Sequence, residues 1–174
     1  MDEHVWSSPR NTIQIVQAIT AALSALDEDH AAAFEANAGA YIEKLQALDA
    51  SFQDAVESGT RDTIVFGDRF PFRYLADAYG LTYYAAFPGC ATETEASAST
   101  IAFLIDKVAE ENIPVVFTIE FSNGKIADVI SESTGAMKLE MHSCHNVSKK
   151  DFDAGVGYLE LMQRNAQQLK EALQ

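Results

Sequence analysis

The sequence predicts an α/β fold, in which a four-stranded, mostly parallel sheet carries helices on both faces and is preceded by a long helical spine. The spine is indicated by apolar residues at three- and four-residue steps up to about residue 58, which is the period of amphipathic helices. The sheet is indicated by short β-rich runs that alternate with helical stretches from residue 62 onward. We therefore divide the chain into residues 1–60, which hold the spine, and residues 61–174, which form an α/β lobe.

Two helices make up the predicted spine. The first covers about residues 8–26, where Ser8 supplies a helix cap and Pro9 takes the first helical position. The second follows the acidic break at residues 27–29 and continues until Ser58-Gly59. With close to 30 residues it would be about 45 Å long, which exceeds the width of a small domain. A helix of that length needs another part of the protein to cover it.

Strands and helices alternate in the predicted lobe, which is the order that parallel βα units require. The strands are expected at residues 63–66, 81–87, 114–119 and 137–141, and the helices at about 71–79, 97–111, 124–134 and 155–172.

Composition excludes several classes of protein. The 174 residues carry a formal net charge of −14, which argues against binding to nucleic acid or anionic lipid. No apolar run is long enough to span a membrane, and the acidic start does not resemble a signal segment. The two cysteines, Cys90 and Cys144, are too few for a disulfide scaffold, and the sequence leaves open whether they are bonded to each other or free.

Donor side chains gather just after the predicted strands, where open parallel sheets bind their ligands. These residues are Asp68, Cys90, Glu93, Glu95, Glu120, His142, Cys144 and His145. The imidazoles and the thiol of residues 142–145 suit zinc or a similar cation. Each group also has a reading without a ligand: an incidental loop for residues 142–145, an internal ion pair for Asp68-Arg69, and solvated or helix-capping positions for the glutamates. No phosphate-binding glycine loop or nucleophile elbow accompanies them.

Several segments point to a known family. Residues 2–11 read Asp-Glu-His-Val-Trp-Ser-Ser-Pro-Arg-Asn, which is similar to the Asp-Pro-His-x-Trp-Leu-x-Pro-x-Asn segment of the zinc/manganese-type solute-binding proteins of bacterial ABC transporters. Further matches lie at residues 40–49, 78–81, 113–120, 133–136 and 158–165. Over essentially its whole length, the chain resembles the C-terminal lobe of these proteins together with the spine. Residues 1–60 would then be the end of a first-lobe segment and the spine, and the signal segment and first lobe would be missing.

The resemblance implies a metal site. The histidine of the family segment binds the metal, which implicates His4. Where the family has His or Glu after the first strand, Asp68 is the nearest substitute. The family's last ligand follows the fourth strand; His142 aligns best there, with Cys144 and His145 as rivals, and we expect this loop to be the main metal contact of the lobe. Glu120 completes the set of candidate ligands.

The resemblance also implies a function without catalysis. The chain would be half of an extracytoplasmic receptor, periplasmic or anchored at the cell surface, that delivers a divalent metal ion to an ABC permease. Imidazole-rich ligation favours zinc over manganese. One alternative is a metal-dependent hydrolase with Glu120 or Glu93 as base; another is an interaction module whose spine helices dimerise. Without the first lobe, we expect weaker zinc binding and association through the exposed apolar stripe of the spine.

Overall fold

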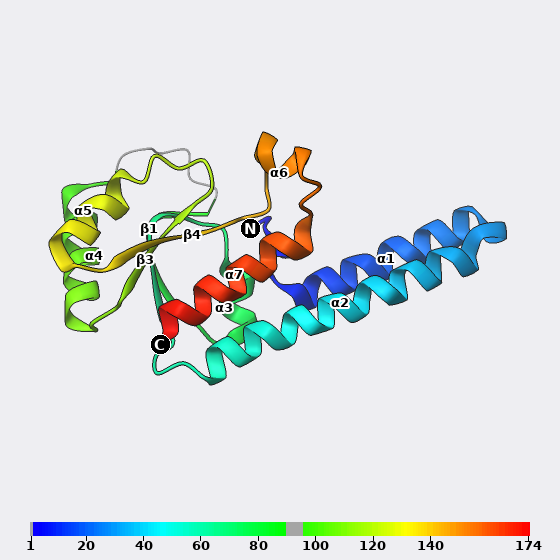
Figure 1. Cartoon of the computed structure of the whole chain (residues 1–174), viewed down its shortest axis with the longest axis horizontal. Helices are drawn as coiled ribbons and strands as arrows, with labels where there is room; N and C mark the ends of the chain where they lie inside the picture. Colours follow the sequence, from blue (N-terminus) through cyan, green and yellow to red (C-terminus); the bar gives the residue numbers. More distant parts are fainter. Residues whose placement is uncertain (1, 90–95) are drawn as a thin grey trace.

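The computed structural model describes residues 2–89 and 96–174, and shows a long helical hairpin that projects from a layered α/β lobe (Figure 1). A short 3-10 turn, Val5–Ser7, leads into α1, Pro9–Leu26. A second 3-10 turn, Glu28–His30, connects α1 to α2, Ala31–Glu57. Both spine helices therefore form where the apolar periodicity predicts them, and Pro9 occupies the start of α1.

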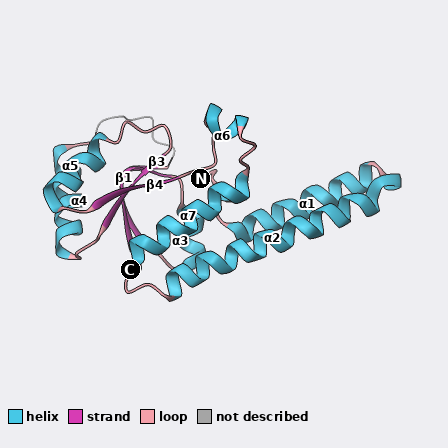
Figure 2. Ribbon diagram, viewed as in Figure 1, coloured by secondary structure: helices cyan, strands magenta, loops and turns pink. Residues whose placement is uncertain are grey.

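The sheet has four parallel strands in the order β2-β1-β3-β4. The strands are β1 (Thr63–Phe70), β2 (Thr82–Pro88), β3 (Val115–Ile119) and β4 (Met137–Met141). The helices of the lobe are α3 (Arg73–Tyr79), α4 (Ala98–Glu110), α5 (Lys125–Thr134), α6 (Lys149–Asp153) and α7 (Tyr158–Leu173). Figure 2 shows helices on both faces of this sheet. The predicted α/β class, the presence of four strands and the parallel direction are confirmed.

Each face of the sheet has its own apolar core, because successive strand residues point to opposite faces. On one face, α2, α3 and α7 cover β1 and β3. The fully buried side chains there include Leu45, Leu48, Phe52, Phe66, Phe72, Phe117, Met162 and Leu169. On the other face, α4 and α5 cover the same two strands. That core contains Val65, Leu104, Val108, Val116, Ala127 and Ile130.

The first strand differs from its prediction. It was expected to end at Phe66, with Gly67 and Asp68 in a following loop, but β1 continues to Phe70. The register shifts between Phe66 and Arg69, which indicates a bulge, and beyond it Arg69 pairs with Phe87 of β2. At Gly67 the backbone approaches α5 so closely that a Cβ atom would lie 2.6 Å from the Ala127 nitrogen. The short helix α6 was also not predicted.

The outer part of the hairpin carries apolar side chains that are exposed in the described structure. Ile19, Leu23 and Leu26 are 53%, 42% and 85% exposed. Near the lobe the same hairpin is well packed, since Leu45, Leu48 and Phe52 of α2 are buried. Among the described residues, no helix combines the length and hydrophobicity needed to cross a membrane. The predicted exposure of the spine stripe is therefore present, whereas association through it stays a prediction.

Candidate metal centre

His4 lies at the base of the hairpin and is held by its own N-terminal neighbour. Its imidazole is almost fully buried, and the Nδ1 atom lies 2.9 Å from the Oδ1 atom of Asp2. The same carboxylate oxygen accepts the His4 backbone N–H at 2.9 Å. With Nδ1–H donating to a carboxylate, a neutral His4 carries its lone pair on Nε2. Sequence reasoning named His4 but missed Asp2, although its position two residues before the histidine was a usable signal.

The loop after β4 brings a second imidazole to His4. The ring centroids of His4 and His145 lie 5.6 Å apart, and the Trp6 ring packs against both, at 5.4 and 5.9 Å. His145 is exposed, whereas His4 is buried. Figure 1 shows the N-terminus near the end of β4, in agreement with the hydrogen bond from Trp6 Nε1 to the Ser143 carbonyl at 2.9 Å. The structure thus pairs imidazoles from opposite ends of the chain.

His142 has a different environment. It is buried, and its Nδ1 atom accepts the backbone N–H of Cys144 at 3.0 Å. Asn165 of α7 fixes the His142 backbone, because its amide oxygen accepts the His142 N–H and its amide nitrogen donates to the His142 carbonyl, both at 2.7 Å. These contacts fix the backbone of the loop at His142. The structure places the His145 ring next to His4, and Asn165 of α7 supports the loop. Sequence reasoning did not identify Asn165.

Cys144 packs against the main core and is a free thiol. Burial, and then the neighbouring Glu120 carboxylate, raise the pKa of this thiol to about 12, so it is protonated at neutral pH. Its Sγ atom donates to the His142 carbonyl at 3.7 Å. The backbone of Cys144 adopts a left-handed conformation with φ 60°. Its possible partner Cys90, together with Glu93 and Glu95, lies outside the described residues.

Glu120, which directly follows β3, accepts hydrogen bonds from Ser143 at both of its carboxylate oxygens. Oε2 accepts the Ser143 backbone N–H at 2.7 Å, and Oε1 accepts the Ser143 hydroxyl. The Ser143 hydroxyl oxygen in turn accepts the His145 N–H at 3.2 Å. Glu120 is therefore connected to the His145 loop by hydrogen bonds. Ser143, which joins the two, was not among the residues that sequence reasoning singled out.

Asp68 lies in the bulged part of β1. Its side chain is buried within β1, where Oδ1 accepts the Arg69 backbone N–H at 2.8 Å and lies 3.9 Å from the Arg69 guanidinium. This contact matches the ion-pair reading of Asp68-Arg69. The Oδ2 atom makes no hydrogen bond to the described residues. In residues 2–89 and 96–174, no three His, Cys, Asp or Glu side chains come close enough together to hold a metal ion.

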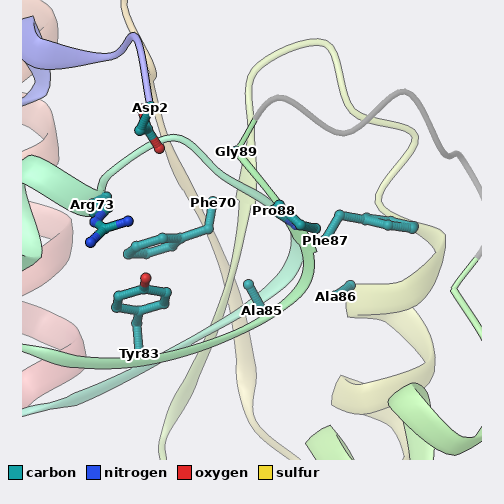
Figure 3. Close-up of a pocket in the computed structure, with 9 residues that line it drawn as sticks. All are labelled: Asp2, Phe70, Arg73, Tyr83, Ala85, Ala86, Phe87, Pro88 and Gly89. Carbon is teal, nitrogen blue, oxygen red and sulfur yellow. The ribbon is translucent and has the colours of Figure 1, made fainter.

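A separate pocket lies beside Asp2, at the free edge of the sheet. Figure 3 shows the Phe70 ring over the Tyr83 ring, with Asp2 and Arg73 on one side and Phe87 on the other. The two stacked rings have centroids 3.7 Å apart. The described residues that line this pocket include no imidazole. It is therefore distinct from the pair formed by His4 and His145.

Comparison with known proteins identifies the family. The family described as "Zinc-uptake complex component A periplasmic" (ZnuA) matches residues 1–172. The chain belongs to the ZnuA family. It is 32% identical over 173 residues to the high-affinity zinc uptake system protein ZnuA of Bacillus subtilis, covering 99% of this chain and 54% of that relative. It is 33% identical to the zinc-binding lipoprotein AdcA of Streptococcus pneumoniae, covering 98% of this chain and 34% of that protein.

Solved structures of the ZnuA family share this fold. The metal-dependent lipoprotein YcdH of B. subtilis superposes with a TM-score of 0.87 at 32% identity, covering all of this chain and 65% of that one. The Zn(II)-bound ZnuA-like domain of S. pneumoniae AdcA gives 0.83 at 32% identity, covering 99% and 64%. The chain thus spans about a third to two thirds of the length of these relatives. The family is described as a transport component, so the hydrolase alternative with Glu120 or Glu93 as base is not supported.

Proposed function

We propose that this chain forms one side of a zinc site in an extracytoplasmic solute-binding protein that delivers zinc to an ABC permease. The pairing of His4 with His145 carries the proposal. Two imidazoles from opposite ends of the chain lie with ring centroids 5.6 Å apart, next to a single tryptophan. Imidazole nitrogen is a preferred zinc ligand, and the names of the relatives specify zinc. We propose zinc, and not manganese, as the cargo for this reason.

The orientation of His4 supports this assignment. Ligating histidines in zinc sites usually donate their second ring N–H to a carboxylate, which fixes the tautomer and strengthens the ligand. Asp2 occupies that position relative to His4, at 2.9 Å from Nδ1. The Nε2 lone pair of His4 is then the one that a zinc ion would use. The exposed His145 would supply the second imidazole from the side of the loop.

Two imidazoles do not complete a zinc site, because zinc in proteins generally has four ligands. We propose that the remaining donors come from parts of the full protein beyond this chain, which spans 54% of the length of the B. subtilis relative. Asp68, a buried carboxylate, is a further candidate donor, although the described residues form no group of three donors that could hold a metal ion. The site would then close between two lobes, and the closed form would be recognised by the permease.

Zinc titration of histidine variants tests the proposal. We expect His4→Ala and His145→Ala each to weaken zinc binding by the chain at least tenfold, about 1.4 kcal/mol, in competition with a chromophoric chelator. His30→Ala is the matched control, because His30 is exposed on the hairpin turn, where it contacts Asp27 and Phe34. His142→Ala should have the smaller effect. Unchanged affinity in both His4→Ala and His145→Ala would refute the assignment.

A further inference from the structure

We infer that Glu120 is a positioning residue of the proposed zinc site. Through Ser143 it holds the loop that carries His145 in its binding arrangement before any metal arrives. The inference rests on the proposed function, but it concerns hydrogen bonds that are present in the structure itself. In this role Glu120 supports a ligand through hydrogen bonds, whereas the sequence suggested that Glu120 itself is a candidate ligand.

Ser143 is the centre of the arrangement, since all of its polar groups are engaged. Its N–H donates to Glu120 Oε2 at 2.7 Å, and its hydroxyl donates to Glu120 Oε1. The hydroxyl oxygen accepts the backbone N–H of His145 at 3.2 Å. The carbonyl accepts the indole N–H of Trp6 at 2.9 Å. Ser143 is 5% exposed, so water cannot easily replace these partners. We call Glu120, Ser143 and Trp6 the loop clamp.

The loop clamp links the two proposed ligands. Trp6 follows His4 by two residues, and Ser143 precedes His145 by two residues, so the bond between Trp6 and Ser143 joins the two ligand segments directly. Trp6 also packs against both imidazoles. Glu120 fixes the Ser143 end of this connection to β3. The separation of the imidazoles is therefore set by side chains that do not themselves need to contact the metal.

The backbone of the loop needs such support. Cys144 lies between Ser143 and His145 and has φ 60°, a conformation that side-chain-bearing residues adopt only when surrounding contacts hold it. Asn165 anchors the loop on the His142 side, and Glu120 anchors it at Ser143. If the Glu120 contacts are lost, the turn at Cys144 can relax and His145 can move away from His4.

A ligand role for Glu120 would conflict with these contacts. Both of its oxygens already accept hydrogen bonds from Ser143, as two neighbouring donors fit the two oxygens of one carboxylate. Rotating the carboxylate toward a metal would leave a buried N–H and a buried O–H without partners, which is costly. The geometry thus favours Glu120 as a fixed support for the loop.

The test compares variants of the loop clamp in the same chain. Ser143→Ala removes the hydroxyl, and Ser143→Thr retains it. Glu120→Gln replaces one carboxylate oxygen by an NH2 group, which cannot accept a hydrogen bond. Glu140→Gln, at an exposed position of β4, is the control for the change of charge near the loop. Zinc affinity is measured by chelator competition, and coordination by the visible absorption of the Co²⁺-loaded chain. The metal-free loop is followed by amide hydrogen exchange and by the fluorescence of Trp6, the single tryptophan.

We expect Ser143→Ala and Glu120→Gln to weaken zinc binding about tenfold or more, as is typical for groups that support a ligand. In the metal-free chain, the amides of Ser143 and His145 should exchange faster and the Trp6 emission should shift. The Co²⁺ spectrum should keep its shape, because the ligands are unchanged. Ser143→Thr should restore affinity and exchange protection, and Glu140→Gln should match the unmodified chain.

Two results would overturn the inference. A changed Co²⁺ spectrum in Glu120→Gln, with loop exchange unaltered, would make Glu120 a ligand. Unchanged affinity and exchange in both Glu120→Gln and Ser143→Ala would leave the loop clamp without a role. Far-ultraviolet circular dichroism identifies any variant that fails to fold. If Glu120→Gln fails to fold, the comparison of Ser143→Thr with Ser143→Ala tests the inference. Failure of the proposed function can be distinguished from failure of this inference. If the proposed function is wrong, the unmodified chain binds zinc weakly, and His4→Ala and His145→Ala do not change that binding. Hydrogen exchange and Trp6 fluorescence without metal still test the loop clamp.

Discussion

At the scale of single residues, neighbouring donor residues in the loop after β4 have different environments. His145 lies beside His4, whereas His142 accepts a backbone hydrogen bond and Cys144 packs into the core. The resemblance to the family implies that His4 is a ligand, which stays a prediction, and the residues alone did not distinguish His142 from His145. That choice depends on the left-handed turn at Cys144 and on the contact between Trp6 and Ser143, which joins distant parts of the chain. Neither feature leaves a pattern in the local sequence.

The thiol of Cys144 offers a prediction at this scale. Because its side chain is partly buried against the core and its Sγ atom donates to the His142 carbonyl, it should not ligate zinc. We expect Cys144→Ala to leave zinc affinity within about threefold of the unmodified chain, well under the tenfold that corresponds to about 1.4 kcal/mol. Chelator competition measures the affinity, with His145→Ala as the positive control. A loss in Cys144→Ala as large as that in His145→Ala would restore Cys144 to the ligand set.

At the scale of secondary structure, periodicity was sufficient for most elements but not for their ends. Both spine helices, four strands and the longer helices of the lobe lie where the apolar pattern predicts them. The predicted end of β1 was wrong. Gly67-Asp68-Arg69 has residue types that are typical of a loop, but a bulge keeps this segment in the sheet. The helix α6 has five residues and buries none of them, so it produces no hydrophobic period to detect.

The bulge region gives the prediction for this scale. A Cβ atom at Gly67 would lie 2.6 Å from the backbone nitrogen of Ala127, so β1 and α5 would have to separate. We expect Gly67→Ala to lower the free energy of unfolding by about 1–3 kcal/mol, which is typical of overpacking. Gly39→Ala is the matched control, because Gly39 lies within α2 with no atom within 4 Å of the added Cβ. That change should stabilise the chain by about 0.5–1 kcal/mol.

Urea denaturation followed by circular dichroism measures both glycine variants. Equal stability of Gly67→Ala and the unmodified chain would mean that the close packing of β1 against α5 does not exist in solution. A destabilised Gly39→Ala would point instead to a contact at that part of the hairpin, where the structure places nothing.

At the scale of the whole molecule, the part of the chain that the structure describes consists of a well-packed lobe and a hairpin that contacts the lobe at one end. Arg10 of α1 holds this end through hydrogen bonds to Asp49 and Gln53 of α2 and to the Ala78 carbonyl of α3. Figure 1 shows the other end extending far from the sheet. Hydropathy predicted the length of the spine and its uncovered stripe. It did not predict which part of the hairpin the lobe would cover, because that depends on how α7 and α2 pack together.

This asymmetry predicts a gradient of stability along the hairpin. Local opening requires less free energy where few apolar contacts are broken. Amides in the outer part, around residues 20–36, should therefore exchange with opening free energies at least about 2 kcal/mol below those near Leu48 and Phe52, which are buried against the lobe. Hydrogen exchange with mass spectrometry resolves the two regions.

Two leucine variants examine the same gradient at equilibrium. Leu48→Ala removes a buried side chain and should cost about 2–5 kcal/mol of unfolding free energy. Leu26→Ala removes one that is 85% exposed and should change it by no more than about 0.5 kcal/mol. Uniform exchange along both helices, together with a large cost for Leu26→Ala, would mean that the outer hairpin is covered in solution. A second copy of the chain would then be the first candidate, and sedimentation at increasing concentration would detect it.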